Sequence, residues 1–284
     1  MGTTPLISCL TVTTERLRLL KDAIGCYLAQ SYAPRELVIV AGGSARYQDA
    51  VRRYLDGLGR ADIRLVPAGA SLSLGAYRNL SMDHARGEFL CQWDDDDLYH
   101  PERLRLQYEA LCAAGADACF LTDLLQYFSD ERSLYWLDWM AYAPAGPDKV
   151  WLPGSILVRR DPRIRYPETG GVAERGEDNA LRTLVFEHLQ ATGLGGRGYL
   201  YVYRYHGRNA YARAHHQALS GTAVDARFIQ ERAPELRRAL AAFPLPLPYI
   251  VRARGGAPVF HYNGPTAADR RPARPAFHAR AEAS

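Results

Sequence analysis

Apolar positions along the first half of the chain follow two alternating periods. Short runs of apolar residues, many of them β-branched, are each followed by a stretch in which apolar residues recur every three or four positions. At 16–30, for example, Leu17, Leu20, Ile24 and Leu28 share one helical face. The predicted strands are 6–12, 36–40, 63–67, 89–93 and 117–125, and the predicted helices are 16–30, 47–58, 74–85 and 102–114. Strands that alternate with helices are typical of a parallel sheet with right-handed crossovers, so we predict an α/β domain of the nucleotide-binding type.

The pattern changes after residue 130, where aromatic residues and prolines crowd 135–147. Further elements are predicted as strands at 150–159 and 199–205 and as helices beginning near Glu177 and spanning 223–241. From Gly255 onward the chain is rich in Gly, Pro, Ala and Arg, which is typical of a flexible tail. We therefore expect one α/β core with an appended C-terminal portion.

Composition narrows the choice of partner and compartment. With 284 residues, 48% of them hydrophobic, the chain can bury a large core. A net charge of +4 does not require a nucleic-acid partner, and none is expected. Lys21 and Lys149 are the only lysines, and the many arginines suit bidentate binding of phosphate. The N-terminus has no signal-peptide pattern and no segment approaches ~20 continuous apolar residues, so we expect a cytoplasmic protein.

Four consecutive aspartates, Asp94, Asp95, Asp96 and Asp97, follow the predicted strand at 89–93. Neighbouring carboxylates raise one another's pKa, and a bound cation relieves their repulsion. In open α/β sheets, ligands bind at the carboxyl ends of strands, where these acids emerge. All-oxygen ligation favours Mg²⁺ or Mn²⁺, completed by substrate phosphates. The alternative is a solvated acidic loop that caps the following helix.

Six short motifs follow one another along the chain: Thr13 to Arg16, Ala-Gly-Gly-Ser at 41–44, Gly-Ala-Tyr-Arg-Asn at 75–79, the aspartate run within 93–101, Gly-Glu-Asp at 176–178 and Tyr-Arg-Tyr-His-Gly-Arg-Asn at 203–209. Their order resembles that of inverting glycosyltransferases of family 2, which have the GT-A fold. The resemblance spans about residues 6–211. It implies an α/β fold with a mostly parallel, Rossmann-like sheet flanked by helices. The expected divisions are a GT-A domain at 1–215 (nucleotide-binding half 1–130, acceptor-side half 131–215), a helical extension at 216–254 and a flexible tail at 255–284.

The resemblance also implies roles for residues around the donor. In this family an acidic D-x-D motif holds a divalent cation against the sugar nucleotide, which makes Asp96 the chief ligand of Mn²⁺ or Mg²⁺ and Asp94 a ribose or second metal contact. His206 matches a position near the metal and is a candidate third ligand, although a structural role, with Arg204 or Arg208 binding phosphate, remains open. The residues implied in binding the nucleotide are Thr13, Arg16, Gly43, Arg78, Asp94 and Asp95.

Glu177 and Asp178 resemble the family's Glu-Asp pair. The resemblance makes Asp178 the general base that takes a proton from the acceptor hydroxyl, and one displacement then inverts the anomeric centre. Glu177 is expected to contact the acceptor. The alternative is that both acids only stabilise the N-terminus of a helix.

The chain departs from the family pattern after its second strand. Ala41 and Gly42 stand where the family has two aspartates, whose carboxylate is associated with the uracil base. The nucleotide-sugar donor is therefore expected to carry UDP, GDP or dTDP, with the base left open. The acceptor is expected to be a saccharide or a lipid-linked molecule of bacterial surface polysaccharide or lipopolysaccharide assembly.

The alternatives to this function are a binding protein without activity and a second class of enzyme, and a membrane contact is a separate expectation. The absence of the two aspartates at 41 and 42 is consistent with a sugar- or nucleotide-binding pseudoenzyme. A sugar nucleotidyltransferase would need a glycine-rich phosphate loop near the N-terminus, and residues 10–15 contain no glycine. The apolar segment 243–251, flanked by Arg237, Arg238, Arg252 and Arg254, suits peripheral contact with an anionic inner leaflet. Its prolines equally suit an extended segment packed in the core.

Overall fold

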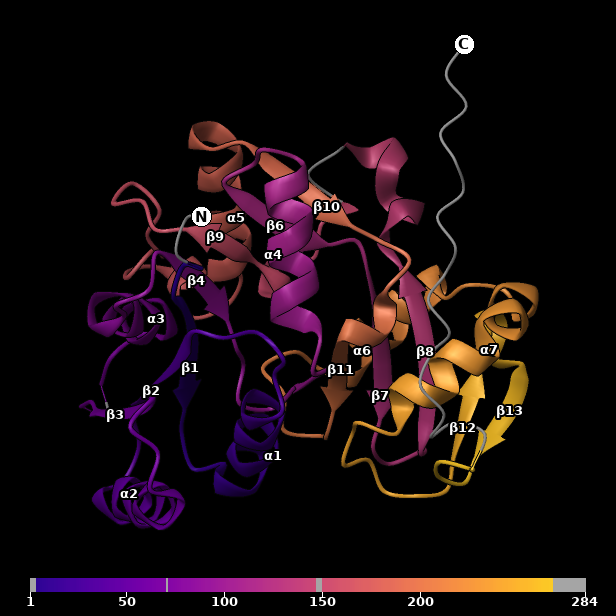
Figure 1. Ribbon diagram of the computed structural model, residues 1–284, viewed down its shortest axis with the longest axis horizontal. Coiled ribbons are helices and arrows are strands. Elements are labelled where there is room, and N and C mark those ends of the chain that lie inside the picture. Colours follow the sequence, from indigo (N-terminus) through magenta and orange to yellow (C-terminus); the bar gives the residue numbers. More distant parts are fainter. Residues whose placement is uncertain (1–3, 70, 147–149, 268–284) are drawn as a thin grey trace.

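The computed structural model describes residues 4–69, 71–146 and 150–267, whose strands form two sheets (Figure 1). The larger sheet contains, from edge to edge, β10 (Ala191–Leu194), β6 (Ala118–Leu121), β9 (Leu157–Arg159), β4 (Phe89–Gln92), β1 (Ile7–Thr13), β2 (Arg35–Ala41) and β3 (Ile63–Pro67). All neighbouring pairs are parallel except those of β9, which runs antiparallel to β4 and β6. The predicted mostly parallel α/β sheet is confirmed.

Helices cover both faces of this sheet because neighbouring strand residues point to opposite sides. Cys9 packs in a core with α1 (Leu17–Leu28), α2 (Ala45–Leu58) and α4 (Arg103–Ala113). The next residue, Leu10, packs on the other face with α3 (Leu74–His84) and α5 (Glu177–His188). Because the strands other than β9 are parallel, their carboxyl ends lie at one edge of the sheet.

The second sheet combines strands from distant parts of the sequence. In order it contains β13 (Pro258–Tyr262), β12 (Tyr249–Arg252), β8 (Ser133–Asp138), β7 (Asp123–Phe128), β11 (Tyr201–Tyr205) and β5 (Leu98–Tyr99). Helix α7 (Ala226–Leu240) packs against β13, and the short α6 (Arg213–Leu219) follows β11. Because β5 follows the aspartate run directly, this sheet holds the far side of the acidic turn.

Several predicted boundaries were wrong. The run predicted as one strand at 117–125 divides at Thr122 into β6 and β7, which belong to different sheets. Of the strand predicted at 150–159 only Leu157–Arg159 is extended, because Pro153 and Gly154 form a 3₁₀ turn. The strand predicted at 199–205 begins at Tyr201, after a 3₁₀ turn.

The predicted tail and helical extension also needed correction. Residues 258–262, expected within a flexible tail, form β13 and pair with β12, which itself lies in the extension predicted to be helical. A short run of Val, Phe, His and Tyr supplies the strand, and the surrounding Gly, Pro and Arg masked it in the composition. The remainder of the predicted tail, 268–284, lies outside the described residues.

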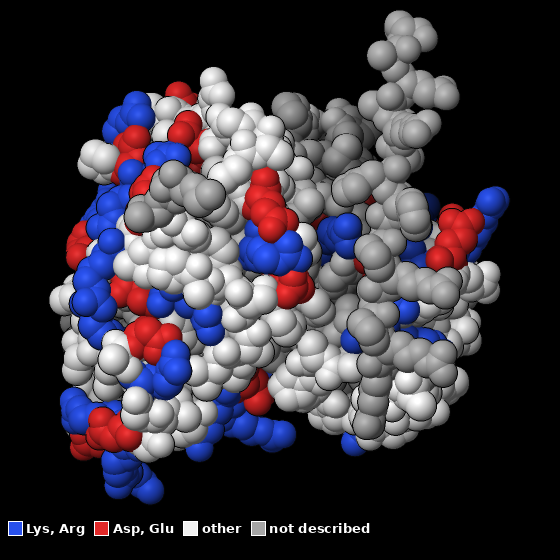
Figure 2. Space-filling model, viewed as in Figure 1, with Lys and Arg blue, Asp and Glu red and all other residues white. Residues whose placement is uncertain are grey.

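The apolar segment proposed to touch a membrane is partly buried. Phe243, Leu245, Tyr249 and Val251 are buried in the core, and Leu247 is the exposed large apolar residue of the segment. Among the described residues, no helix is long and apolar enough to cross a membrane. Figure 2 shows acidic and basic side chains interspersed over the N-terminal half of the visible face.

Candidate active site

The aspartate run lies at the carboxyl edge of the larger sheet, as predicted. Asp94 to Asp97 leave β4 beside the end of β1, where the backbone N–H of Trp93 donates to the carbonyl of Leu10 (2.9 Å). They line a cavity of about 390 Å³ whose opposite wall is the start of α5, with Glu177 and Asp178. Residues about eighty positions apart are thus brought to one cavity.

Arg78 joins the two acidic groups. This buried arginine on α3 donates from Nη1 to Asp94 Oδ1 (2.9 Å) and from Nε to Glu177 Oε1 (2.8 Å). Gln92, the last residue of β4, donates from Nε2 to Asp94 Oδ2 (2.9 Å). Since Asp94 and Glu177 are each held by the same guanidinium, Arg78 fixes the distance across the cavity.

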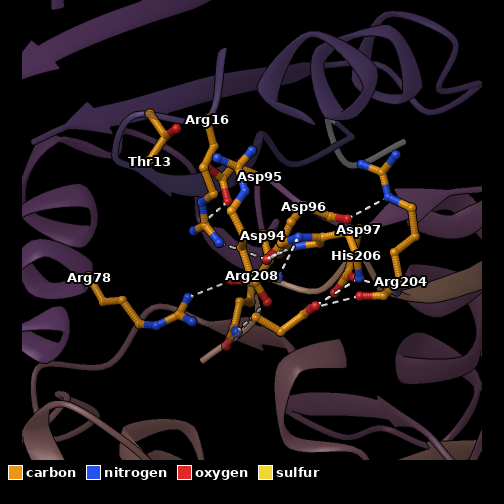
Figure 3. Close-up of polar contacts among 12 residues, drawn as sticks. Thr13, Arg16, Arg78, Asp94, Asp95, Asp96, Asp97, Arg204, His206 and Arg208 are labelled. Atoms are coloured by element: carbon orange, nitrogen blue, oxygen red, sulfur yellow. Dashed lines mark hydrogen bonds and ion pairs between the residues drawn. The ribbon is translucent and has the colours of Figure 1, made fainter. Parts of the chain in front are cut away.

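Arg16 and His206 hold the next two aspartates. Arg16, at the N-terminus of α1, forms ion pairs with Asp95 Oδ1 and Asp96 Oδ2, both at 2.8 Å (Figure 3). His206 Nε2 lies 3.2 Å from Asp96 Oδ2. Burial and the charge of Asp96 raise the pKa of Asp95 to about 7, whereas the hydrogen bond from His206 and the charge of Arg16 hold the pKa of Asp96 at about 2 despite its burial.

Asp97 anchors the acidic turn to the second sheet. Its carboxylate accepts from the backbone N–H of Arg204 (2.9 Å) and from the hydroxyl of Tyr201, both on β11. It is 2% exposed, and burial raises its pKa well above the usual range. Asp97 therefore joins the acidic turn to the second sheet, at the border of the cavity.

Asp178 lies in the first turn of α5 with its carboxylate in the cavity. Burial, with a further contribution from the charge of Glu177, raises its pKa to about 6, although Arg78 acts in the opposite direction. The backbone N–H of Asn179 donates to its Oδ1 (2.8 Å). A carboxylate with a pKa close to neutral is suited to general-base chemistry.

Not every predicted site residue reaches the cavity. Thr13 is fully buried at the end of β1, where its hydroxyl is hydrogen-bonded to that of Tyr47, and the flanking Val12 and Thr14 line the cavity instead. Gly43, with φ of +81°, forms the turn after β2, and a Cβ there would lie 2.7 Å from Glu15 Oε1. Both lie near the cavity without lining it.

The partner of Arg78 in the Arg-Asn motif has a structural role. Asn79 donates to the carbonyl of Tyr166 (2.9 Å) and to Glu168 Oε1 (2.7 Å), and its Oδ1 accepts from the N–H of Tyr166. It fixes the segment before α5 against α3. Neighbouring residues on a helix point in different directions, which separates the roles of Arg78 and Asn79.

Sequence reasoning missed several residues of the cavity. Gln92 was detectable as a polar residue in an otherwise apolar strand. Tyr211 also lines the cavity, and the ring of His215, which lacked a trusted motif, stacks on Tyr211 at 4.3 Å. Tyr77 covers the end of β2: a Cβ on Gly42 would lie 2.5 Å from its hydroxyl oxygen. These positions depend on tertiary contacts that periodicity does not reveal.

The residues present fit part of a divalent-cation site. Among the described residues, no group of three or more His, Cys, Asp or Glu side chains is arranged to hold a metal. Asp96 Oδ2 and His206 Nε2, however, are 3.2 Å apart, a spacing suited to two ligands of one ion. Asp95 Oδ2 is buried and has no hydrogen-bond partner. Such a donor set needs substrate oxygens to complete it, which is the usual arrangement for Mg²⁺ and Mn²⁺ on phosphates.

Comparison with known proteins gives matches to one family. The model of "Glycosyl transferase family 2" matches residues 8–168. The succinoglycan biosynthesis protein ExoO of Rhizobium meliloti is 30% identical over 147 residues, which are 51% of this chain and 41% of that protein. The putative colanic acid biosynthesis glycosyl transferase WcaA of Escherichia coli is 32% identical over 104 residues, which are 37% of each chain. The chain thus spans about two fifths of the length of these relatives.

Solved structures show the same fold at low sequence identity. TarS of S. aureus in complex with UDP-GlcNAc gives a TM-score of 0.55 at 15% identity, covering 84% of this chain and 68% of that one. The mannosyltransferase PcManGT from Pyrobaculum calidifontis, in complex with GDP-Man and Mn²⁺, gives 0.53 at 16% identity, covering 84% and 64%. The fold is therefore GT-A, as predicted.

Proposed function

The chain belongs to glycosyl transferase family 2, and from this premise we propose that it is a metal-dependent, inverting glycosyltransferase of the hexosyltransferase type. It transfers a sugar from a nucleoside diphosphate to a hydroxyl of a saccharide or lipid-linked acceptor. The observation that carries the proposal is the shared cavity, because Asp94, Asp96 and Asp178 all line it. The names of the relatives favour a role in bacterial polysaccharide assembly.

Asp178 is the proposed general base. Its carboxylate lies in the cavity, and a pKa of about 6 leaves it mostly ionised at neutral pH yet basic enough to accept a proton. An acceptor hydroxyl beside it loses its proton as the oxygen attacks the anomeric carbon. Glu177 is already engaged by Arg78, so we propose that it positions the site and contacts the acceptor.

The wall of the cavity that faces Asp178, formed by the aspartate run, is the proposed site of the donor diphosphate. Asp96 and His206 are the proposed cation ligands, with Asp94 as the ribose or second metal contact. The bound cation would neutralise the charge that develops on the leaving diphosphate. Arg16 and Arg78 line the same cavity, and their guanidinium groups keep the acids in place when no cation is bound.

The nucleotide base is proposed to lie at the end of the cavity lined by Val12, Thr14, Leu72 and Tyr77. No acidic side chain can enter from position 42, because the Tyr77 ring fills that space. The base is thus held by an aromatic and apolar surface. The solved relatives carry UDP-GlcNAc or GDP-Man, and UDP, GDP and dTDP all remain candidates for this chain.

Substitution of the proposed general base, Asp178, tests the proposal. Asp178→Asn keeps the shape of the side chain but removes its basicity, so sugar transfer should fall by at least ~10²-fold while donor binding changes little. Glu187→Gln, an exposed residue on the same helix, is the matched control and should transfer sugar at the wild-type rate. Transfer by the Asp178→Asn protein within a fewfold of wild type would refute the role of Asp178.

A further inference from the structure

A second cavity lies beside the candidate active site. It has a volume of about 490 Å³ and is bounded by the start of α1, the end of β11 and the segment 244–246. Arg16 lines both cavities, and His206, whose Nε2 faces Asp96, lines the second one. The two cavities are therefore neighbours separated by these two side chains.

The lining of the second cavity is mainly basic. Its charged or ionisable side chains are Glu15, Arg16, Arg18, Asp22, Arg204, His206 and Arg208. Both acids have other partners, because Asp22 is paired with Arg204 (2.8 Å) and Glu15 accepts from the backbone N–H of Ser44 (2.7 Å). Arg18 and Arg208 are exposed at the cavity. The cavity is thus electrostatically suited to an anion.

Arg204 lines this cavity with an unused donor. Its side chain is only 7% exposed, its Nε donates to the carbonyl of Asp96 and its Nη1 to Asp22 Oδ2 (2.8 Å). Its Nη2 is buried and has no hydrogen-bond partner, and the same is true of Arg16 Nε. Buried guanidinium N–H groups normally have acceptors, so a ligand with acceptor oxygens would complete them.

The N-terminus of α1 opens into the same cavity. Leu17, Arg18 and Leu19 of its first turn line the cavity, and the N-cap residue Arg16 makes no side-chain capping hydrogen bond. The first turn contains no acid. The backbone N–H groups at this end, together with the helix dipole, favour a bound anion.

The far wall is apolar and aromatic. It is formed by Tyr127, Pro244, Leu245 and Pro246. The hydroxyl oxygen of Tyr127 is buried and has no hydrogen-bond partner. A ligand in this cavity would therefore meet guanidinium groups and a helix N-terminus on one side and a hydrocarbon surface on the other.

We propose that this second cavity binds a phosphate or diphosphate group, independently of the donor cavity and without a metal ion. Free diphosphate and a prenyl diphosphate present the same anionic group. They differ in the hydrocarbon chain that the apolar wall would contact.

Calorimetric titration of the full chain with inorganic diphosphate, in EDTA and at constant ionic strength, tests the proposal. We expect one binding event, weakened at least ~10-fold in the double variant Arg18→Gln, Arg208→Gln. The matched control is Arg46→Gln, Arg53→Gln, which removes two exposed arginines of α2 that line neither cavity and should leave the affinity unchanged. Arg78→Gln, whose side chain lines the first cavity and not the second, should also retain binding at a temperature where circular dichroism shows the variant to be folded.

Geranyl diphosphate serves as the second probe. Tighter binding than inorganic diphosphate, by ~10-fold or more, would support the proposal with a phosphorylated lipid as the ligand, and equal affinity would support it with a free anion. Absence of metal-free binding would overturn the proposal. So would binding that is lost in Arg78→Gln but kept in the Arg18→Gln, Arg208→Gln protein, because the anion would then lie in the first cavity. Equal weakening by the α2 control would show nonspecific charge and would overturn it as well.

Discussion

Removal of the Arg78 guanidinium should destabilise the fold and also raise the pKa of Asp178, the proposed general base. The substitution Arg78→Gln breaks two ion pairs and leaves Asp94 and Glu177 without their cation. Breaking a fully buried ion pair costs about 3–5 kcal/mol. Arg78 and Glu177 are 11% and 5% exposed, but Asp94 is 21% exposed and faces the cavity, where water can solvate its charge. We therefore place the loss in unfolding free energy at the low end, about 3 kcal/mol.

Urea denaturation at neutral pH measures this loss. The matched control is Arg165→Gln, which breaks an ion pair with Asp83 whose two side chains are 38% and 55% exposed and which should cost at most ~1 kcal/mol. In a thermal scan, Arg78→Gln should lower Tm by roughly 6–12 °C. Equal destabilisation by the two variants would refute the reasoning that the Arg78 pairs are shielded from solvent.

A pH profile provides a second readout of the same substitution. The charge of Arg78 lowers the pKa of Asp178, so its removal should raise that pKa above about 6. The pH at which transfer is half-maximal should then move upward. A profile that stays in place while stability falls would show that Arg78 acts only on the fold.

Three further outcomes follow from the site geometry. In the wild-type protein Asp178 must be ionised to accept a proton, so kcat/KM should fall about tenfold per pH unit below pH 6 and level off above it, and a pH-independent rate between 5 and 7 would contradict this. Tyr201→Phe leaves Asp97 Oδ2 without its hydroxyl donor and should cost about 1–3 kcal/mol in urea denaturation; no loss would mean that the hydrogen bond is not formed. Gly42→Ala places a Cβ 2.5 Å from the hydroxyl oxygen of Tyr77 and should lower the unfolding free energy by about 1–3 kcal/mol, whereas in a Tyr77→Ala background the same substitution should have little further effect. A neutral Gly42→Ala in the wild-type background would show that the ring lies elsewhere.

Local pattern was sufficient to predict the doubly covered sheet. The runs at 6–12, 36–40 and 63–67 each alternate with an amphipathic helix, so a parallel sheet with right-handed crossovers, and the edge that carries the acids, follow from the local pattern. The position of the aspartate run at the end of β4 was predicted for the same reason. These features depend on residues that are close in sequence.

The second sheet and the pairing of the acids depend on contacts between distant residues. Strand β11 pairs with β5 and β7, and the pattern of apolar residues in 199–205 does not predict which strands it pairs with. Likewise, only the family resemblance assigned a role to Asp94, and the sequence showed no contact that distinguishes it from Asp97. Both residues line the cavity, but the carboxylate of Asp97 is hydrogen-bonded to β11, whereas that of Asp94 is held by Arg78 and Gln92. Thr13 faces inward because neighbouring positions on a strand point to opposite sides.

The most direct test of the account is a thermal-shift titration with UDP, GDP and dTDP, each with and without Mn²⁺. We predict stabilisation by at least one nucleotide that requires Mn²⁺ and is lost in Asp96→Asn but kept in Asp178→Asn, because the first residue is a proposed cation ligand and the second acts only on the acceptor. If none of the nucleotides stabilises the protein with Mn²⁺ present, the cavity at Asp94 to Asp97 is not a donor site and the proposed function is wrong.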